Sequence, residues 1–378
     1  MTCNNEWDYL EEVIVGVANG SKIPTPTTSL MSCVYPEYEK EYIETLVGNW
    51  RLEILREQID DLEILSKTLE QLGVKVYRPE MGINTLFDWH WHCPRDLTLV
   101  IGNKIIETPS PIENRKNETK AYEYIFRKYY EEKGYDWIKA ARPSFSDENY
   151  QTDDIDRKPT LLNKEPMFEA ANCMKINNDI LYQISNTGNE LGGHWLQEIL
   201  GNQYKVHILH DLYSYAHLDS TIIPLREGLV LYNASRVNED NEPELFKSWD
   251  KIWIDECYSA PKKYDVPWGA SAWIGLNLLS VNPNLAIVDR KQKQLIEEYK
   301  KIRSIIEDNK FAMSDNYYFL FGSVTVEDYE DDIEFFAEAN AYENLEVYAF
   351  NQICWPDYLD TETKVQIFYR YLSQGICT

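Results

Sequence analysis

Three short stretches of the chain place an acidic residue just ahead of a predicted hairpin. PRDL contains Asp96, EPMFEAANC contains Glu169, and AHLDST contains Asp219 with His217 two positions before it. If the hairpins surround a common axis, these carboxylates meet in one pocket and repel one another unless a cation lies between them. A guanidinium suits that place, because its planar N–H fork donates to carboxylates in pairs. Acids before strands also serve as turn or cap groups, but the matching positions favour a site.

A guanidinium held by carboxylates beside a histidine lacks only a nucleophile to react. A cysteine thiolate could attack the guanidinium carbon and hold the amidino group as a thiouronium. His217 would protonate the departing amine and then deprotonate the incoming one. Glu169, hydrogen-bonded to that imidazole, would orient it and stabilise its cation.

The stretch DWHWHCPRD (88–96) suggests a metal site as an alternative. His90 and His92 would share a face of a strand, and Cys93 could add a soft ligand. The chain has only six histidines, and no second Cys/His cluster is available to complete four-coordination. We therefore expect no metal and no other cofactor. Asp96 is the predicted functional residue here, and its three neighbours line or support the rim of the pocket.

The elements that would position these residues repeat along the chain. The first unit is the strand EEVIVGVANG, a helix with apolar residues (six leucines and Ile59) every three or four positions from Leu52 to Leu72, and the strand VKVYRP. Later units begin with hairpins, marked by turns such as Gly102-Asn103 and Asn177-Asn178. A doubly wound sheet has lone strands alternating with helices. Five such units instead fit a radial arrangement of small α/β modules around an axis.

The C-terminal part departs from this repeat. Residues 311–343 are acidic and aromatic and fit no module, and a predicted strand follows them. No low-complexity linker separates the parts. We therefore expect a single domain over 1–378, with core modules at about 5–300 and 345–355, an insert at about 311–343 and a tail at 356–378.

Composition limits the classes of partner. The chain is 44% hydrophobic and has a formal charge of −26, so it is globular and its surface repels nucleic acid and anionic lipid. The N-terminus has no signal-peptide pattern, and no run of eighteen apolar residues could span a membrane. Seven scattered cysteines form no CxxC motif and no even framework, which indicates a reduced, cytoplasmic protein.

Several motifs, in order from about residue 5 to residue 300, resemble the glycine, inosamine and related amidinotransferases. They are NEWDYLEEVIVG, CPRDLTLVIGNKIIETP, EPMFEAAN, the stretch through YKVHIL, HLDSTI, GLVLYN and SAWIGLNLL. That family belongs to the pentein superfamily. The resemblance implies a five-module α/β propeller with pseudo-fivefold symmetry, here with an atypical C-terminal insertion and tail.

The resemblance also implies roles for individual residues. His217 and Glu169 match the acid–histidine relay that works with a cysteine, although the creatine-pathway members carry Asp in place of Glu169. Asp96 and Asp219 match the carboxylates that bind the donor guanidinium. Arg236, which follows the Tyr-Asn strand end, matches a group that holds the donor's α-carboxylate.

The remaining family positions concern substrate binding and the nucleophile. Ser271, which opens SAWIGLNLL, is a predicted substrate-binding residue. The family's G-G-x-H-C loop is absent from this chain. Cys354, in FNQICWPDY after the predicted last strand, is the candidate nucleophile. Cys377, in SQGICT, is a second candidate, and the absence of any equivalent thiol is a third possibility.

The sequence leaves several functions open. The first is amidino transfer from arginine to an amine other than glycine in small-molecule biosynthesis, with a homodimer expected from the family. A repurposed member could keep the guanidinium pocket without the thiol, as a ligand-binding protein or with different chemistry. A deiminase-like hydrolase would use water as acceptor. A metal enzyme based on His90, His92 and Cys93 is the fourth alternative.

Overall fold

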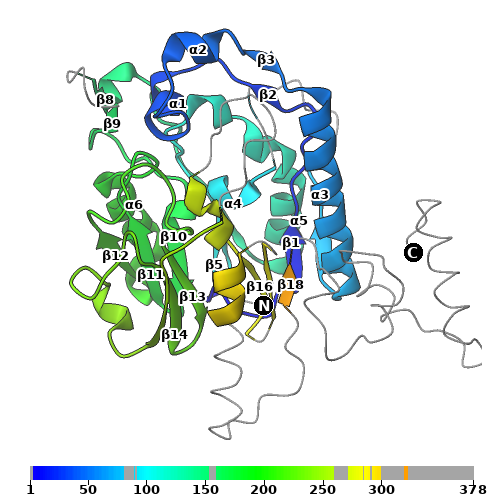
Figure 1. The fold of residues 1–378 in the computed structure, drawn as a ribbon, viewed down its shortest axis with the longest axis vertical. Coiled ribbons are helices and arrows are strands. Elements are labelled where there is room, and N and C mark those ends of the chain that lie inside the picture. The colour runs from blue at the N-terminus through cyan, green and yellow to red at the C-terminus, as the bar shows by residue number, and fades with distance from the viewer. Residues whose placement is uncertain are drawn as a thin grey trace, which may run out of the picture.

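The computed structural model describes residues 3–80, 89, 92–152, 159–258, 271–283, 285–289, 292–298 and 319–321. Four three-stranded sheets follow one another along the chain, each with the same topology (Figure 1). In each sheet two antiparallel strands form a hairpin, and a third strand joins parallel to the second. The strands are β5 (Thr98–Ile101), β6 (Lys104–Glu107) and β7 (Asp136–Lys139); β10 (Cys173–Ile176), β11 (Asp179–Gln183) and β12 (Lys205–Leu209); β13 (Ile222–Arg226), β14 (Leu229–Asn233) and β15 (Asp250–Ile254); β16 (Leu279–Asn282), β17 (Leu285–Val288) and β18 (Phe319–Phe321).

The first unit is simpler, because its sheet has two parallel strands. β1 (Glu12–Ile14) pairs with β4 (Lys75–Tyr77), and the twenty-residue helix α3 (Leu52–Gln71) connects into β4. This agrees with the predicted strand–helix–strand order. Between β1 and α3 the chain adds a small antiparallel pair and two short helices: β2 (Lys22–Ile23), β3 (Gly48–Asn49), α1 (Thr28–Cys33) and α2 (Lys40–Glu44).

The remaining helices lie in the connections. They are α4 (Pro94–Leu97), α5 (Glu123–Lys133), α6 (Glu190–Leu200) and the 3₁₀ turns Glu113–Arg115, Glu118–Ala121, Asp147–Asn149, Ala170–Asn172, Gly201–Gln203, Glu244–Phe246 and Ala272–Leu276. A further pair of short strands, β8 (Tyr150–Gln151) and β9 (Thr160–Leu161), is antiparallel. Among the described residues, no helix has the length and apolarity needed to cross a membrane.

Local sequence explains where several elements end. Gly134 ends α5 in the left-handed conformation, with φ of 69°, which glycine adopts without a steric penalty. Asn177 makes the β10–β11 turn with φ of 55°, a region that asparagine tolerates better than most residues. Asn189 caps α6, because its side chain accepts a hydrogen bond from the Gly192 amide. The turn at Asn177 and the helix end at Gly134 agree with the turn and stop signals in the sequence.

The core is divided among apolar clusters that join neighbouring units. Buried residues of the β5–β7 unit pack with those of the β10–β12 unit, the latter with β13–β15, and these with β16–β17. The first unit contacts both ends of the series: Val17 packs with Ile105 and Phe126, while Val15 and Leu69 pack with Val281 of β16. Burial of these surfaces is the main source of stability, and it holds the units side by side.

One boundary expected from the sequence is wrong in part. The segment 311–343 was expected to lie outside the modules, but β18 (Phe319–Phe321), which lies within it, pairs parallel to β17. The short run Tyr-Phe-Leu-Phe is flanked by acidic and polar residues. A strand of only three residues in such a segment gives too weak a hydrophobic pattern to be predicted. β18 gives the last sheet the same hairpin-plus-parallel topology as the other three.

Candidate active site

Three connections place the predicted site residues in equivalent positions. Asp96 lies on the short helix α4 directly before β5. Glu169 precedes the 3₁₀ turn that leads into β10. His217 and Asp219 stand just before β13. The last two connections run side by side, because the amide of Leu218 donates to the carbonyl of Ala171 at 3.0 Å.

The imidazole of His217 lies between two of the carboxylates. Its Nε2 is 2.7 Å from Oε2 of Glu169, a hydrogen bond, and its Nδ1 is 3.8 Å from Oδ1 of Asp96. Because Nε2 is engaged by a fully buried carboxylate, Nδ1 is the ring nitrogen left to exchange a proton with a reactant. The carboxylate fixes the ring orientation, as a base-orienting acid must.

The other oxygens of the same two carboxylates contact Arg115. Nη1 of Arg115 donates to Oδ2 of Asp96 at 2.7 Å and lies 3.3 Å from Oε1 of Glu169. Nε and Nη2 both donate to Oε2 of Glu118, at 3.0 and 2.9 Å. Ser110 donates its hydroxyl to Oε1 of Glu169 at 2.8 Å. Arg115 is only 3% exposed, so this guanidinium is a resident cation of the site.

These charges set the protonation of the cluster. Burial lowers the pKa of His217, but Asp96, Glu169 and Asp219 outweigh it and raise the pKa to about 9. Burial raises the pKa of Asp96, but His217 and Arg115 outweigh it and hold the pKa below its ordinary value. At neutral pH, His217 is therefore an imidazolium and Asp96 is a carboxylate.

Asp219 is left open in this arrangement. Within the described part of the chain, its carboxylate has no hydrogen-bond or ion-pair partner. Burial raises the pKa of Asp219 above its ordinary value, although His217 and Arg95 oppose that rise. Arg95 cannot serve as the partner, since its guanidinium donates to the carbonyls of Ala170 and Cys173. A cation that entered here would find an unneutralised acid.

Arg236 and Ser271 form a second, separate group. Nη1 of Arg236 donates to the hydroxyls of Ser220 and Thr221 at 3.0 and 2.8 Å, and Nη2 donates to Oγ of Ser271 at 3.0 Å. The guanidinium lies over the ring of Tyr213, 3.5 Å from its centroid. Burial lowers the pKa of Arg236 below its usual range. No carboxylate among the described residues pairs with it.

The cysteines do not complete the site within the described residues. Cys354 and Cys377, the predicted nucleophile and its alternative, lie outside them. Cys93 lies near the cluster as the residue before α4, but burial and the neighbouring Asp96 raise the pKa of its thiol well above the ordinary value. A thiol held in its protonated form is a poor nucleophile.

The DWHWHCPRD stretch is described only in part, because His90 lies outside the described residues. His92 is partly buried, and burial together with Arg115 lowers its pKa to about 4. His92 is therefore neutral at physiological pH. Cys93 accepts, through its backbone carbonyl, a hydrogen bond from the Asp96 amide at 3.1 Å. This contact helps to fix the turn that presents Asp96.

A metal ion does not fit the central cluster well. Asp96, Glu169 and His217 do offer ligand atoms within 4.8 Å of one another. However, Arg115 already contacts an oxygen of each carboxylate, and the hydrogen bond between Glu169 and His217 uses another pair of atoms. An ion would have to break these bonds and lie beside a guanidinium charge. The donor set is that of a hydrogen-bonded cluster.

Sequence reasoning missed Arg115, Glu118 and Ser110. They lie in the connection after β6, a part of the second unit that carries no recognisable catalytic motif. The spacing of Arg115 and Glu118 is that of an i,i+3 pair, which on its own indicates a surface ion pair. Both side chains are instead 2% exposed, and only the fold reveals this.

Comparison with known proteins identifies relatives over about four fifths of the chain. The chain is 40% identical over 310 residues to inosamine-phosphate amidinotransferase 1 of Streptomyces glaucescens, which covers 80% of this chain and 88% of that protein. It is 33% identical over 316 residues to the L-arginine:L-lysine amidinotransferase of Pseudomonas savastanoi pv. phaseolicola, with 78% and 84% covered. No protein-family model matches the chain.

A solved structure shows the same fold. The inosamine-phosphate amidinotransferase of Streptomyces griseus superposes with a TM-score of 0.73 at 39% identity, over 80% of this chain and 88% of that one. This likeness confirms the α/β fold of the amidinotransferases that the sequence led us to expect. The chain belongs to the amidinotransferase family and is an enzyme of the transferase class.

Proposed function

We propose that the chain transfers an amidino group from arginine to an amine other than glycine, in small-molecule biosynthesis, through a cysteine thiouronium. The observation that carries this proposal is the His217–Glu169 hydrogen bond of 2.7 Å, flanked by Asp96 and the open carboxylate of Asp219. Relatives named as amidinotransferases of inosamine phosphate or of lysine support amidino transfer as the reaction class.

In the first half-reaction the donor guanidinium binds against Asp96 and Asp219. A cysteine thiolate, for which Cys354 is the candidate, attacks the guanidinium carbon and forms a C–S bond. The C–N bond to the side chain of arginine then breaks. His217 gives its proton to the departing amine, and ornithine leaves. A pKa of about 9 supports this role, because the imidazole carries a proton at neutral pH.

In the second half-reaction the acceptor amine attacks the thiouronium carbon. His217, now neutral, takes the proton that the amine loses as the new C–N bond forms. The C–S bond breaks, and the cysteine leaves as a thiolate. Glu169 keeps the imidazole oriented and stabilises its cation in both half-reactions.

Arg236 and Ser271 suit the other end of the donor. Arg236 is partly buried and has no carboxylate partner among the described residues, in a chain with a formal charge of −26, so it is suited to bind an anion. The α-carboxylate of arginine is such an anion. Tyr213 and Ser271 hold the guanidinium in place, so little side-chain freedom is lost when the donor binds.

The test is intact-protein mass spectrometry after incubation with arginine alone, quenched in acid. The wild type is expected to gain one amidino group, and Cys354→Ala is expected to gain none. Cys377→Ala tests the alternative nucleophile, and Cys257→Ala is the control for a partly buried thiol outside the proposed chemistry. Screening amines for a guanidinylated product then identifies the acceptor.

Two other outcomes would assign different functions. Arginine binding by calorimetry without any adduct would indicate a repurposed pocket that binds ligands or performs other chemistry. Conversion of arginine to a ureido product without an amine would indicate a hydrolase. The five-module propeller with pseudo-fivefold symmetry, the single domain over 1–378 and the homodimer belong to the same proposal. The repeated sheet topology and the shared clusters between units support the first of these.

A further inference from the structure

We propose that Arg115 is a positioning residue of this enzyme: it fixes Asp96 and Glu169 so that one oxygen of each faces His217, and it is their permanent counter-cation. The inference deepens the proposed function and rests on it for its kinetic arm. Within the described part of the chain, Arg115 makes no hydrogen bond to the imidazole of His217. It therefore acts through the two carboxylates.

The geometry divides the four carboxylate oxygens between two cations. Oδ2 of Asp96 and Oε1 of Glu169 lie 2.7 and 3.3 Å from Nη1 of Arg115. Oδ1 of Asp96 and Oε2 of Glu169 lie 3.8 and 2.7 Å from the two ring nitrogens of His217. Each carboxylate thus bridges Arg115 and His217, and rotation of either one would break a contact on both sides.

Glu118 holds Arg115 in turn. It accepts two hydrogen bonds from Arg115 through Oε2, whereas its buried Oε1 has no hydrogen-bond partner within the described part of the chain. Burial raises the pKa of Glu118 to about 8, against the opposing effect of Arg115. Glu118 therefore braces the guanidinium at its Nε–Nη2 edge, which leaves Nη1 directed at Asp96 and Glu169.

The charge balance explains why such a cation is needed. Asp96 and Glu169 share one buried site, and like charges so close cannot both ionise without compensation. His217 supplies compensation only while it is protonated, and the proposed reaction removes that proton in the first half-reaction. Arg115 keeps its charge throughout, since Glu118, Glu169 and Asp96 outweigh burial and hold its pKa well above the ordinary value.

Other ionisable groups also face this cluster. Besides Arg115 and Glu118, the groups that interact electrostatically with Asp96, Glu169 or His217 include Cys33, His92, Cys93, Arg95, Asp219 and the phenols of Tyr122 and Tyr150, whose pKa values are raised by burial. The thiols are protonated and His92 is neutral at pH 7, and Arg95 is held by backbone carbonyls. Among the described residues, Arg115 is the only cation besides His217 that contacts both Asp96 and Glu169 directly.

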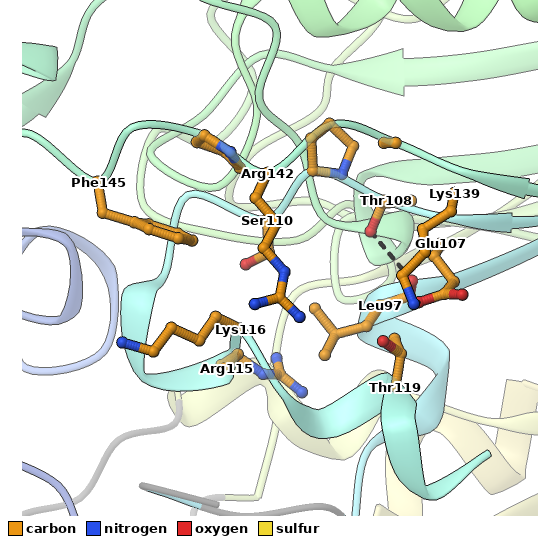
Figure 2. A pocket seen from close by; sticks show the side chains of 13 residues that line it. Leu97, Glu107, Thr108, Ser110, Arg115, Lys116, Thr119, Lys139, Arg142 and Phe145 are labelled. Carbon is orange, nitrogen blue, oxygen red and sulfur yellow. Dashed lines mark hydrogen bonds and ion pairs between the residues drawn. The ribbon is translucent and has the colours of Figure 1, made fainter. Parts of the chain in front are cut away.

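A cavity beside Arg115 supplies a matched control. The cavity, of about 40 Å³, is lined by Arg115 and Ser110 and also by Arg142, whose guanidinium points into it (Figure 2). Arg142 has no hydrogen-bond or ion-pair partner among the described residues and does not touch Asp96 or Glu169. Arg142→Met therefore removes the same charge from the same cavity without affecting the carboxylates.

The kinetic arm compares the pH dependence of ornithine release in wild type, Arg115→Met, Arg115→Lys and Arg142→Met. Without Arg115 the pKa of Asp96 rises, so the acid limb of the Arg115→Met profile is expected to move up by about one pH unit or more. The Met variant should also lose about 10²-fold in rate at its optimum, because the carboxylates lose their fixed orientation. Arg115→Lys should restore the acid limb.

An acid limb that stays in place in Arg115→Met would overturn the inference, whatever happens to the rate. A limb that moves equally in Arg142→Met would also overturn it. A purely structural role would lower the amount of active enzyme by the same factor at every pH.

The second arm needs no turnover, so it separates this inference from the proposed function. The His217 titration is followed by NMR and assigned by its loss in His217→Gln. Its midpoint should move upward in Arg115→Met, because a nearby positive charge is gone, and stay unchanged in Arg142→Met. If Arg115→Met does not fold, Arg115→Gln, which also removes the positive charge, is measured instead. A fixed His217 midpoint in the charge-removing variant that folds would overturn the inference.

Discussion

Two cationic groups in this enzyme are balanced in opposite ways. Arg115 is enclosed, donates to three carboxylates and leaves almost no surface exposed. Arg236 is partly buried, held by the hydroxyls of Ser220, Thr221 and Ser271 and by the ring of Tyr213, and pairs with no acid among the described residues.

The difference distinguishes a cation whose charge is neutralised by carboxylates from a cation whose charge no described acid neutralises. A guanidinium surrounded by neutral partners is fixed in position but keeps its charge available for a ligand. A guanidinium surrounded by carboxylates is neutralised within the protein and has no charge available for a ligand. Asp219 is an acid without a partner among the described residues. Under the proposed function, the guanidinium and the α-carboxylate of the donor would each meet an unpaired group of opposite charge.

The largest effect is expected at the proton-transfer residue, on the Arg115 side of the comparison. His217→Gln should slow ornithine release by roughly 10²- to 10⁴-fold, the range typical of a lost general acid. Single-turnover assays quenched at successive times measure the rate of ornithine release. His207 supplies the control, because it also pairs with an acid, Asp179, at 2.6 Å but on β12. Equal losses in His207→Gln and His217→Gln would contradict the assignment.

Asp219 should give the next largest effect. Asp219→Asn removes a charged hydrogen-bond acceptor for arginine, about 1.5–3 kcal/mol, so calorimetry should show a Kd roughly 10- to 150-fold higher. Asp211→Asn, an exposed acid in the same connection, should leave the Kd unchanged.

The pH dependence of arginine binding tests the same residue. The pKa of Asp219 is raised above its ordinary value in the free enzyme, and a bound guanidinium favours the ionised form. Binding should therefore weaken as pH falls through that raised pKa, and it should release protons there. Calorimetry in buffers of different ionisation enthalpy measures the release, which Asp219→Asn should abolish.

A smaller effect with higher selectivity is expected at Arg236. Arg236→Met should raise the KM for arginine roughly tenfold, because a charged hydrogen bond to the α-carboxylate is lost. The KM for agmatine, a donor with the same guanidinium but no carboxylate, should not change. The ratio of kcat/KM for the two donors isolates the carboxylate contact. An equal loss with both donors would place Arg236 elsewhere in the mechanism.

Ser271→Ala should have the smallest effect. It removes one neutral hydroxyl that accepts from Arg236 and leaves the contacts of that residue to Ser220 and Thr221 intact. The cost is about 1 kcal/mol, or roughly fivefold in KM for arginine. A loss as large as that of Arg236→Met would mean that Ser271 touches the donor itself.

Much of the fold could be predicted from the sequence because its signals are local. The turn at Asn177, the helix stop at Gly134 and the leucine periodicity of α3 each depend on a few adjacent residues. The convergence of Asp96, Glu169 and His217 could be predicted because equivalent loops of a repeat meet in space. Arg115 could not, since its burial depends on contacts with residues 19 and 54 positions away in the chain.

The backbone of the N-terminal segment connects several sheets and has a consequence for the order of folding. Cys3 pairs with Gly102, Asn5 bridges to Ile176, and the amide of Leu10 donates to the carbonyl of Val281. On the ribosome these residues are made before their partners, which emerge long afterwards. The segment must therefore wait for most of the chain, so its closure is a late, high-contact-order step. Pulse-labelled hydrogen exchange during refolding should show the Leu10 amide protected after those of β10–β12.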